Sequence, residues 1–268
     1  MTQGARGPLP PTDQDPSAGD AAALDAAALD AATLPAAARN PAALAQGGPW
    51  LLALHSSSDC LGLGLQQLGA PAAACTLRHA PLGRRLSQDL FQWVEDLLPA
   101  CAWPQLGRLA VATGPGGFTG TRLTVVLART LAQQLQVPLD GLSSFQLMAH
   151  RLLPPAGPAA CKDSPRWLLQ ELPRHGLVAG LYGREASSPG GIREWQPPRL
   201  YRTAAELSAC AAALGAPWQP GDGLTAEPAL PQDVAELLRL SQAAAAAGRP
   251  GPWAPVLPLY PTSPVGNA

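Results

Sequence analysis

The sequence has few charged residues, few aromatic residues and no long uninterrupted apolar run. Charged side chains make up 14% of its 268 residues, and a formal net charge of -1 leaves no basic excess for an autonomous nucleic-acid-binding surface. No apolar run reaches membrane-spanning length, and the amino terminus lacks the basic and then apolar pattern of a secretory signal. We therefore expect a cytoplasmic protein with no membrane contact, which reaches RNA only through a partner.

Metal and disulfide motifs are also missing. The 5 cysteines are odd in number and include no Cys-x-x-Cys pair, which fits neither a disulfide framework nor a zinc site and favours a reducing compartment. No histidine has another histidine three or four residues away, so the helical His-x-x-x-His metal motif is absent. The sequence thus predicts no metal site, and we expect no cofactor.

Hydrophobic side chains make up 47% of the chain, which is enough to bury a core in one large or two small domains. Residues 1–48 are set apart by low complexity, with a repeat of the type Asp-Ala-Ala-Ala-Leu over residues 20–34. A period of five moves the leucines around a helix instead of keeping them on one face. We expect residues 1–48 to be a disordered extension, which a start codon assigned too far upstream would also produce.

The pattern of the first half predicts an α/β unit with an antiparallel start. Apolar runs and turn residues predict a strand hairpin, then a third strand, later a buried strand and finally another short strand; these lie at residues 50–54, 60–65, 75–80, 109–113 and 139–142. Apolar spacing predicts helices at residues 86–98 and 121–135, and Ser143 and Ser144 are expected to cap a helix that runs to about residue 152.

The proline-rich residues 154–166 cannot sustain a helix or a central strand, because proline removes a backbone donor and fixes φ. We therefore place a linker there, between a first lobe of residues 49–153 and a second lobe of residues 167–262, followed by a tail of residues 263–268. The second lobe is predicted to hold strands at residues 167–171, 177–184 and 199–202, a helix at residues 203–214, and a final helix that starts after Pro231 and ends before Gly248.

Three segments resemble the TsaB (YeaZ-like) family. Residues 51–65 resemble its first hairpin, and Gly114-Pro-Gly-Gly-Phe-Thr-Gly-Thr-Arg122 is similar to its Gly-x-Gly-Pro-Gly-Ser-Phe-Thr-Gly-Leu-Arg motif. Residues 254–260 are similar to its closing Pro-x-Tyr motif. The similarity covers roughly residues 50 to 262 and is strongest before residue 152.

The resemblance implies an actin-like, Hsp70-like and sugar-kinase-like (ASKHA) fold, a duplicated two-lobe α/β fold in which mixed sheets are flanked by helices. It also implies a non-catalytic scaffold subunit in the threonylcarbamoyladenosine modification of tRNA. The partners it implies are a TsaD-like catalytic subunit and a TsaE-like ATPase, with a homodimer as a further possibility.

Two positions depart from the family pattern. His55 stands where family members usually have an Asp after the first strand, and an imidazole cannot replace a carboxylate that attracts a cation. Glu171-Leu-Pro-Arg174 stands where the family tends to have Asp-Ala-Arg. The first departure disfavours hydrolysis of a magnesium-bound nucleotide at this loop, and the second leaves the role of residues 171–174 open.

Candidate site residues fall into two groups. Gly114, Gly116 and Gly117 precede a helix and could cradle an anion with their backbone N-H groups, or could simply permit a tight turn. The resemblance implies a partner interface on the two helices of the first lobe, for which the candidates are Phe91, Glu95, Leu98, Arg122, Val125, Arg129 and Ala132. No residue is expected to be catalytic, since Ser56, Ser57 and Ser58 lack a nucleophile-elbow motif and are better explained as turn hydroxyls.

Three alternatives remain at this point. An ATP-dependent kinase or ATPase of the same fold would bind nucleotide, although His55 disfavours it. A peptidase would need a metal or nucleophile constellation, which the histidine spacing does not supply. A divergent, self-associating interaction protein would form a dimer that excludes a TsaD-like subunit.

Overall fold

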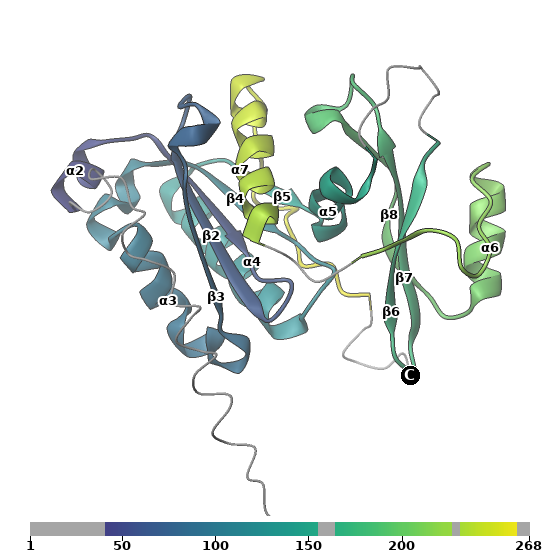
Figure 1. Ribbon diagram of the computed structural model, residues 1–268. Helices are drawn as coiled ribbons and strands as arrows, with labels where there is room; N and C mark the ends of the chain where they lie inside the picture. Colours follow the sequence, from purple (N-terminus) through teal and green to yellow (C-terminus); the bar gives the residue numbers. More distant parts are fainter. Residues whose placement is uncertain (1–40, 155–163, 227–230, 262–268) are drawn as a thin grey trace, which may run out of the picture. The chain divides into compact units, whose positions relative to one another are not determined.

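The computed structural model describes residues 41–154, 164–226 and 231–261, which form two sheets with helices packed on them (Figure 1). The predicted extension up to residue 40, the predicted tail of residues 263–268 and most of the predicted linker lie outside the described residues. None of the described helices has the length and apolar character that crossing a membrane requires.

The first sheet has five strands in the order β3-β2-β1-β4-β5. Their bounds are β1 (Trp50–His55), β2 (Cys60–Gln67), β3 (Thr76–Pro81), β4 (Leu106–Ala112) and β5 (Leu139–Leu142). β1, β2 and β3 pair antiparallel, whereas β4 pairs parallel with both β1 and β5. The predicted antiparallel start, the buried strand that becomes β4 and the short strand that becomes β5 are confirmed.

Both faces of the first sheet are covered, which explains why β1 is an almost continuous apolar run. Leu52 and Leu54 join a core with helices α3 (Leu86–Leu97) and α4 (Phe118–Leu135). Leu51 and Ala53 point to the opposite face, where they pack against helix α7 (Pro231–Ala246). The alternation follows from the two-residue period of a strand.

Helix α7 comes late in the chain but packs on the early strands. A Cβ built on Gly62 would lie 2.3 Å from Val234 Cγ2, and one built on Gly64 would lie 2.7 Å from Leu238 Cδ1. These glycines of β2 therefore permit the helix to approach the sheet closely. The division into lobes at residues 49–153 and 167–262 stays a prediction, but by its contacts α7 belongs with the first sheet.

The second sheet has four strands in the order β8-β7-β6-β9. Their bounds are β6 (Arg166–Leu172), β7 (Gly176–Arg184), β8 (Ile192–Tyr201) and β9 (Leu224–Thr225). Helix α6 (Ala204–Ala213) supplies Leu207 and Ala211 to the core on one face, and helix α5 (Ser144–Leu152) packs on the other. The sequence pattern located β6 and β7, found only the end of β8, and missed β9, which has two residues.

A short helix, α2 (Pro41–Gln46), lies before β1 and was not predicted. Leu44 is 1% exposed and belongs to the core of the first sheet, and the Trp50 indole N-H donates a hydrogen bond of 3.0 Å to its carbonyl. The predicted boundary at residue 48 is therefore too late in the chain. The remaining short elements are the 3-10 helices η4 (Ala72–Ala74), η5 (Gly83–Arg85), η6 (Ala100–Gln105) and η7 (Pro189–Gly191).

Helix α5 is capped at both ends. The Ser143 hydroxyl accepts a hydrogen bond from the Gln146 N-H at 3.0 Å, which confirms the predicted cap. At the other end, the Arg184 guanidinium donates to the carbonyls of His150 (3.1 Å) and Leu153 (2.8 Å). Arg184 comes from β7, so it also joins α5 to the second sheet.

Candidate functional site

The candidate site lies where β1, β4 and β5 end. These strands run parallel, so their carboxyl ends meet at one edge of the sheet. Residues 56–59 follow β1, residues 113–117 follow β4, and Ser143 follows β5. In open α/β sheets this edge is where ligands usually bind, which makes it the first place to test for a functional site.

The glycine loop closes directly onto the turn after β1. The Gly117 N-H donates to the Ser57 carbonyl at 2.8 Å, and a Cβ built on Gly116 would lie 2.0 Å from the same oxygen. Gly114 has φ of 96°, a conformation that favours glycine, and Pro115 has no N-H. The Gly117 N-H is therefore already hydrogen-bonded within the protein.

That packing bears on the anion-cradle hypothesis for Gly114, Gly116 and Gly117. The glycines permit a tight turn and a close backbone approach to Ser57. This is the second of the two roles that the sequence left open for them. An anion would have to displace the Ser57 carbonyl to reach the Gly117 N-H. Anion binding by this loop stays a prediction that the geometry does not favour.

The serine hydroxyls after β1 are tied to neighbouring elements. The Ser144 hydroxyl donates to the Ser57 hydroxyl at 2.6 Å, and the Ser56 hydroxyl lies 2.9 Å from that of Thr124 on α4. These partners of the Ser56 and Ser57 hydroxyls are themselves hydroxyls, not a histidine or a carboxylate. This arrangement agrees with their interpretation as turn hydroxyls rather than nucleophiles.

A second pair of hydroxyls joins the site to the second sheet. The Ser143 hydroxyl lies 3.1 Å from the hydroxyl of Tyr182, and the Tyr182 hydroxyl donates to a Glu194 carboxylate oxygen at 2.7 Å. Burial, followed by the nearby charge of Glu194, raises the pKa of Tyr182 well above its usual value. Tyr182 is therefore a neutral hydrogen-bonding group at physiological pH.

His55 is sealed inside the protein. It is 1% exposed, and its Nε2 has no hydrogen-bond partner among the described residues. Burial lowers the pKa of His55 to about 4; the charge of Asp233 opposes this shift, and that of Arg151 adds to it. The imidazole is neutral near pH 7, so it brings neither positive nor negative charge to the site.

The charged groups nearest to His55 come from distant parts of the sequence. The Arg151 Nε donates to the Asp233 Oδ1 at 2.9 Å, and Asp233 is 2% exposed at the start of α7. The sequence pattern placed Asp233 only in the first turn of a helix. No signal in the sequence relates residue 55 to residue 233, because the packing of α7 on the sheet brings them together.

The interface candidates separate into exposed and buried groups. Phe91 is 57% exposed, and Glu95 and Arg122 are also exposed. Arg129 is half-buried, and its Nη2 donates to the Ala254 carbonyl at 3.4 Å. These side chains lie on α3 and α4, where they are accessible to a partner.

Three other interface candidates need correction. Leu98, Val125 and Ala132 are each 0% exposed and belong to the core of the first sheet. Val125 and Ala132 face the sheet from α4, and Leu98 follows directly after α3. A periodic apolar pattern does not distinguish a core position from a docking position. Because they are buried, these three residues cannot contact a partner, and their prediction as interface residues is wrong.

Val126, which is 52% exposed on α4, was not among the predicted interface residues. Neither were Phe118 and Tyr260, whose rings lie 4.7 Å apart between centroids at an interplanar angle of 37°. The similarity of residues 254–260 to a family motif was the only signal that this segment matters. Within the described residues, no group of three or more His, Cys, Asp and Glu side chains is placed to hold a metal ion.

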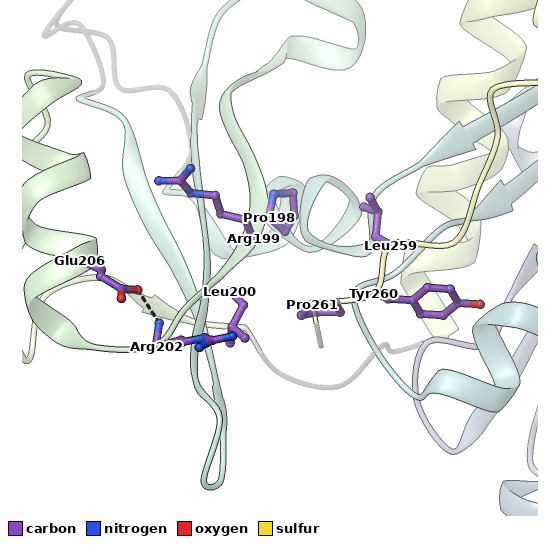
Figure 2. Close-up of a pocket in the computed structure, with 8 residues that line it drawn as sticks. All are labelled: Pro198, Arg199, Leu200, Arg202, Glu206, Leu259, Tyr260 and Pro261. Atoms are coloured by element: carbon purple, nitrogen blue, oxygen red, sulfur yellow. Dashed lines mark hydrogen bonds between the residues drawn. The ribbon is translucent and has the colours of Figure 1, made fainter. Parts of the chain in front are cut away.

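Figure 2 shows a pocket of about 560 Å³ beside the last described residues. Its lining residues are Pro198, Arg199, Leu200, Arg202, Glu206, Leu259, Tyr260 and Pro261. The Arg199 side chain points away from Leu259 and Tyr260 in this view and lies over the Tyr201 ring, 4.6 Å from its centroid. Glu206 accepts a hydrogen bond from the Arg202 backbone N-H at 2.8 Å.

Comparison with known proteins finds similar proteins both by sequence and by fold. A family model described as tRNA N6-adenosine threonylcarbamoyltransferase (TsaD) matches residues 81–165. The tRNA threonylcarbamoyladenosine biosynthesis protein TsaB of Bacillus subtilis (strain 168) is 43% identical over 101 residues, which are 37% of this chain and 43% of that protein. Part of the chain is thus similar in sequence to a TsaB protein. The aligned part spans less than half of the B. subtilis relative.

Solved structures extend the likeness to most of the fold. YeaZ from Pseudomonas aeruginosa matches with a TM-score of 0.56 and 21% identity, over 79% of this chain and 99% of that chain. A protein described as having similarity to peptidase YEAZ, from the same organism, matches with a TM-score of 0.55 and 21% identity, over 80% and 99% of the two chains. The predicted α/β fold with mixed sheets flanked by helices is thus confirmed and is shared with the YeaZ structures, whereas its membership of the ASKHA superfamily stays a prediction.

Proposed function

We propose that this chain is a non-catalytic subunit that binds and orients a TsaD-like catalytic subunit in the threonylcarbamoyladenosine modification of tRNA. The TsaB and TsaD similarities support the pathway. The observation that carries the scaffold role is the exposure of Phe91 and Val126, at 57% and 52%, on helices α3 and α4. Large apolar side chains at adjoining helices are typical of a surface that a partner covers.

The geometry at the strand ends supports a non-catalytic role. The glycine loop is occupied by Ser57, the serine hydroxyls are engaged with other hydroxyls, and His55 is buried and neutral. The Gly117 N-H and the serine hydroxyls are therefore bonded within the protein, and a neutral imidazole stands where a carboxylate would attract a cation. On this proposal tRNA and a TsaE-like ATPase meet the complex through the catalytic subunit, in the cytoplasm, and the chain needs no cofactor of its own.

Co-expression with the TsaD-like subunit of the same organism tests the proposal. The two chains should co-purify at a fixed ratio, and Phe91→Asp should weaken the complex at least about tenfold, because it places a charge in an apolar contact. Leu214→Asp is the matched control, since Leu214 is 43% exposed at the end of α6, away from α3 and α4. Thermal unfolding of each variant alone should match that of the wild type.

Two results would contradict the scaffold role. One is the absence of a complex when both wild-type chains are folded. The other is turnover of a magnesium-bound nucleotide or a peptide by the isolated chain at an enzyme's rate, which would favour a kinase, ATPase or peptidase instead.

A further inference from the structure

Residues 249–261, named here the carboxy-terminal strap, run along the free edge of β5. The Leu139 N-H donates to the Gly251 carbonyl at 2.8 Å, and the Leu259 N-H donates to the Thr113 carbonyl at 2.7 Å. Between these two points Val256 is buried, and a Cβ built on Gly141 would lie 2.7 Å from its Cγ1. The strap therefore covers the sheet edge that β5 would otherwise leave open.

The strap is rich in proline, with prolines at positions 252, 255, 258 and 261. Trp253 packs against the core of the first sheet and Val256 is buried, whereas Ala254, Leu257 and Tyr260 are exposed. The Val256 N-H donates to the Trp253 carbonyl at 3.2 Å, which closes a turn within the strap, and each proline fixes its own φ. The strap therefore presents Leu257 and Tyr260 from a backbone with restricted conformational freedom.

Helix α4 places an exposed row of residues beside the strap. Phe118, Arg122 and Val126 recur at intervals of four, which puts them along one side of the helix. The Phe118 ring packs against Tyr260, and Arg129 reaches the Ala254 carbonyl. In Figure 2 the Tyr260 ring points away from Pro198 and Leu200, which leaves it on the side of the first sheet.

Together these side chains form one surface, which we call the α4–strap surface; it comprises Phe118, Arg122, Val126, Arg129, Leu257 and Tyr260. Its apolar members are substantially exposed, at 40% for Phe118, 52% for Val126, 56% for Leu257 and 37% for Tyr260. A contiguous surface with this much apolar exposure is characteristic of a binding site.

The α4–strap surface carries charge of one sign only. Residues 118–135 and 249–261 contain no Asp or Glu, whereas they contain Arg122, Arg129 and Arg249. Two copies of this surface facing each other about a twofold axis would oppose arginine to arginine, which disfavours a second copy of the chain as the occupant. A partner with carboxylates around an apolar contact is complementary to it.

We infer that the α4–strap surface docks an apolar segment of a partner protein flanked by Asp or Glu side chains, with Leu257 and Tyr260 as anchors and Arg122 and Arg129 pairing with the carboxylates. The inference rests on the proposed function, in which that partner is the TsaD-like subunit. Val126 and Leu257 favour a protein over RNA as the occupant, because aliphatic side chains offer no stacking surface to a base. The prolines lower the entropic cost of docking, since the strap is ordered beforehand.

The test measures binding of the full-length chain to the TsaD-like subunit by surface plasmon resonance. Leu257→Asp should raise the dissociation constant at least about tenfold, mainly through faster dissociation. Arg122→Glu should lower the association rate constant about tenfold at low salt, and this difference should shrink as salt screens the charges. Leu214→Asp should bind as the wild type does, and the melting temperature of each variant alone shows that it is folded.

The outcomes separate this inference from the proposed function. If the wild-type complex forms and Phe91→Asp weakens it, but Leu257→Asp and Arg122→Glu bind normally, the α4–strap surface is overturned while the scaffold role stands. If no wild-type complex forms, both are overturned. If Arg122→Glu instead abolishes binding of fluorescently labelled tRNA and leaves the protein complex intact, the occupant is RNA and the inference is wrong.

Discussion

The two sheets are completed by different parts of the chain. The second sheet takes β6, β7, β8 and α6 from one stretch, residues 166–213, and adds only β9 and one face of α5. The first sheet needs α2 from the amino-terminal side and α7 and the strap from the carboxy-terminal side. The sheet that carries the candidate site is therefore the one that depends on contacts between residues far apart in the sequence.

The contrast is visible in the strands. β1 is buried along nearly its whole length, because helices cover both faces of its sheet. β8 is an edge strand with many exposed positions, and it carries Pro197 and Pro198, which protect an edge from pairing with another chain. Changes at long-range contacts should consequently damage the first sheet most.

The largest expected effect is at Asp140, which joins β4, β5 and α7. Arg108 donates to it from Nε at 2.7 Å and Nη2 at 2.8 Å, Ser241 donates from α7, and Arg108 also reaches the Arg249 carbonyl of the strap. Asp140→Ala leaves the Arg108 charge buried without its partner, so we expect a loss of about 3–5 kcal/mol in the free energy of unfolding. Urea denaturation measures the loss.

The matched control for Asp140→Ala is Arg193→Ala. Arg193 pairs with Glu185 at 3.0 Å, but its side chain is 50% exposed, so solvent screens the pair. This variant should unfold at nearly the wild-type urea concentration. Equal effects for the two variants would remove the distinction between the long-range network and a surface pair.

The next effect compares the helices that complete each sheet. Leu238→Ala on α7 and Leu207→Ala on α6 each remove a side chain that is at most 1% exposed, and each should cost about 2–5 kcal/mol. Native-state hydrogen exchange should show faster exchange in β1 and β2 for Leu238→Ala, and in β7 and β8 for Leu207→Ala. Identical exchange patterns would mean that the sheets do not differ in how they are held.

A third effect depends on pH and belongs to the first sheet alone. The pKa of His55 is about 4 in the fold, against 6.5 for an unperturbed histidine, so as pH falls the unfolded chain takes up this proton first. His55 should therefore lower the free energy of unfolding by about 3 kcal/mol as pH falls from 6.5 to 4. Above pH 6.5 it should have no effect on the pH dependence of stability. His55→Gln should flatten that part of the stability curve.

His175→Gln is the control for the pH experiment. His175 is exposed in the turn between β6 and β7, so this variant removes a histidine without disturbing the buried surroundings of His55. A wild-type slope in His55→Gln would show that another group is responsible.

The smallest effect is expected where the two sheets meet. Tyr182→Phe removes the hydroxyl between Ser143 and Glu194, but Ser143 keeps its hydrogen bond from Gln146. We expect a loss of about 1 kcal/mol, close to the net value of one hydrogen bond. A drop as large as that of Asp140→Ala would mean that this junction matters as much as the long-range network of the first sheet.

Much of the fold could be predicted from the sequence because local signals set it. The strand hairpin, the helix stopped by Pro99 and the Ser143 cap all follow from side-chain periodicity and backbone chemistry within a few residues. The sequence did not predict β9, because two residues are too few to show a periodicity. It did not predict α2, because one buried leucine in a low-complexity segment gives no recognisable helix pattern.

The candidate site was less predictable. The glycines of residues 114–117 indicated a tight turn, but only the tertiary structure shows that the Gly117 N-H donates to the Ser57 carbonyl. Apolar spacing identified α3 and α4, yet it could not separate buried Leu98, Val125 and Ala132 from exposed Phe91 and Val126. Burial depends on what packs against a helix, which a single sequence does not state.

The sequence by itself determined most of the order of strands and helices, except α2 and β9, together with the family resemblance and the replacement of an expected carboxylate by His55, because these depend on neighbouring residues or on residue identity alone. Tertiary structure decided that α7 and the strap complete the first sheet, that His55 is sealed and neutral beside Asp233, and that Leu257 and Tyr260 share a surface with α4. These features join residues separated by more than a hundred positions. Such contacts follow from the burial of apolar area in the folded chain, and no local pattern records them.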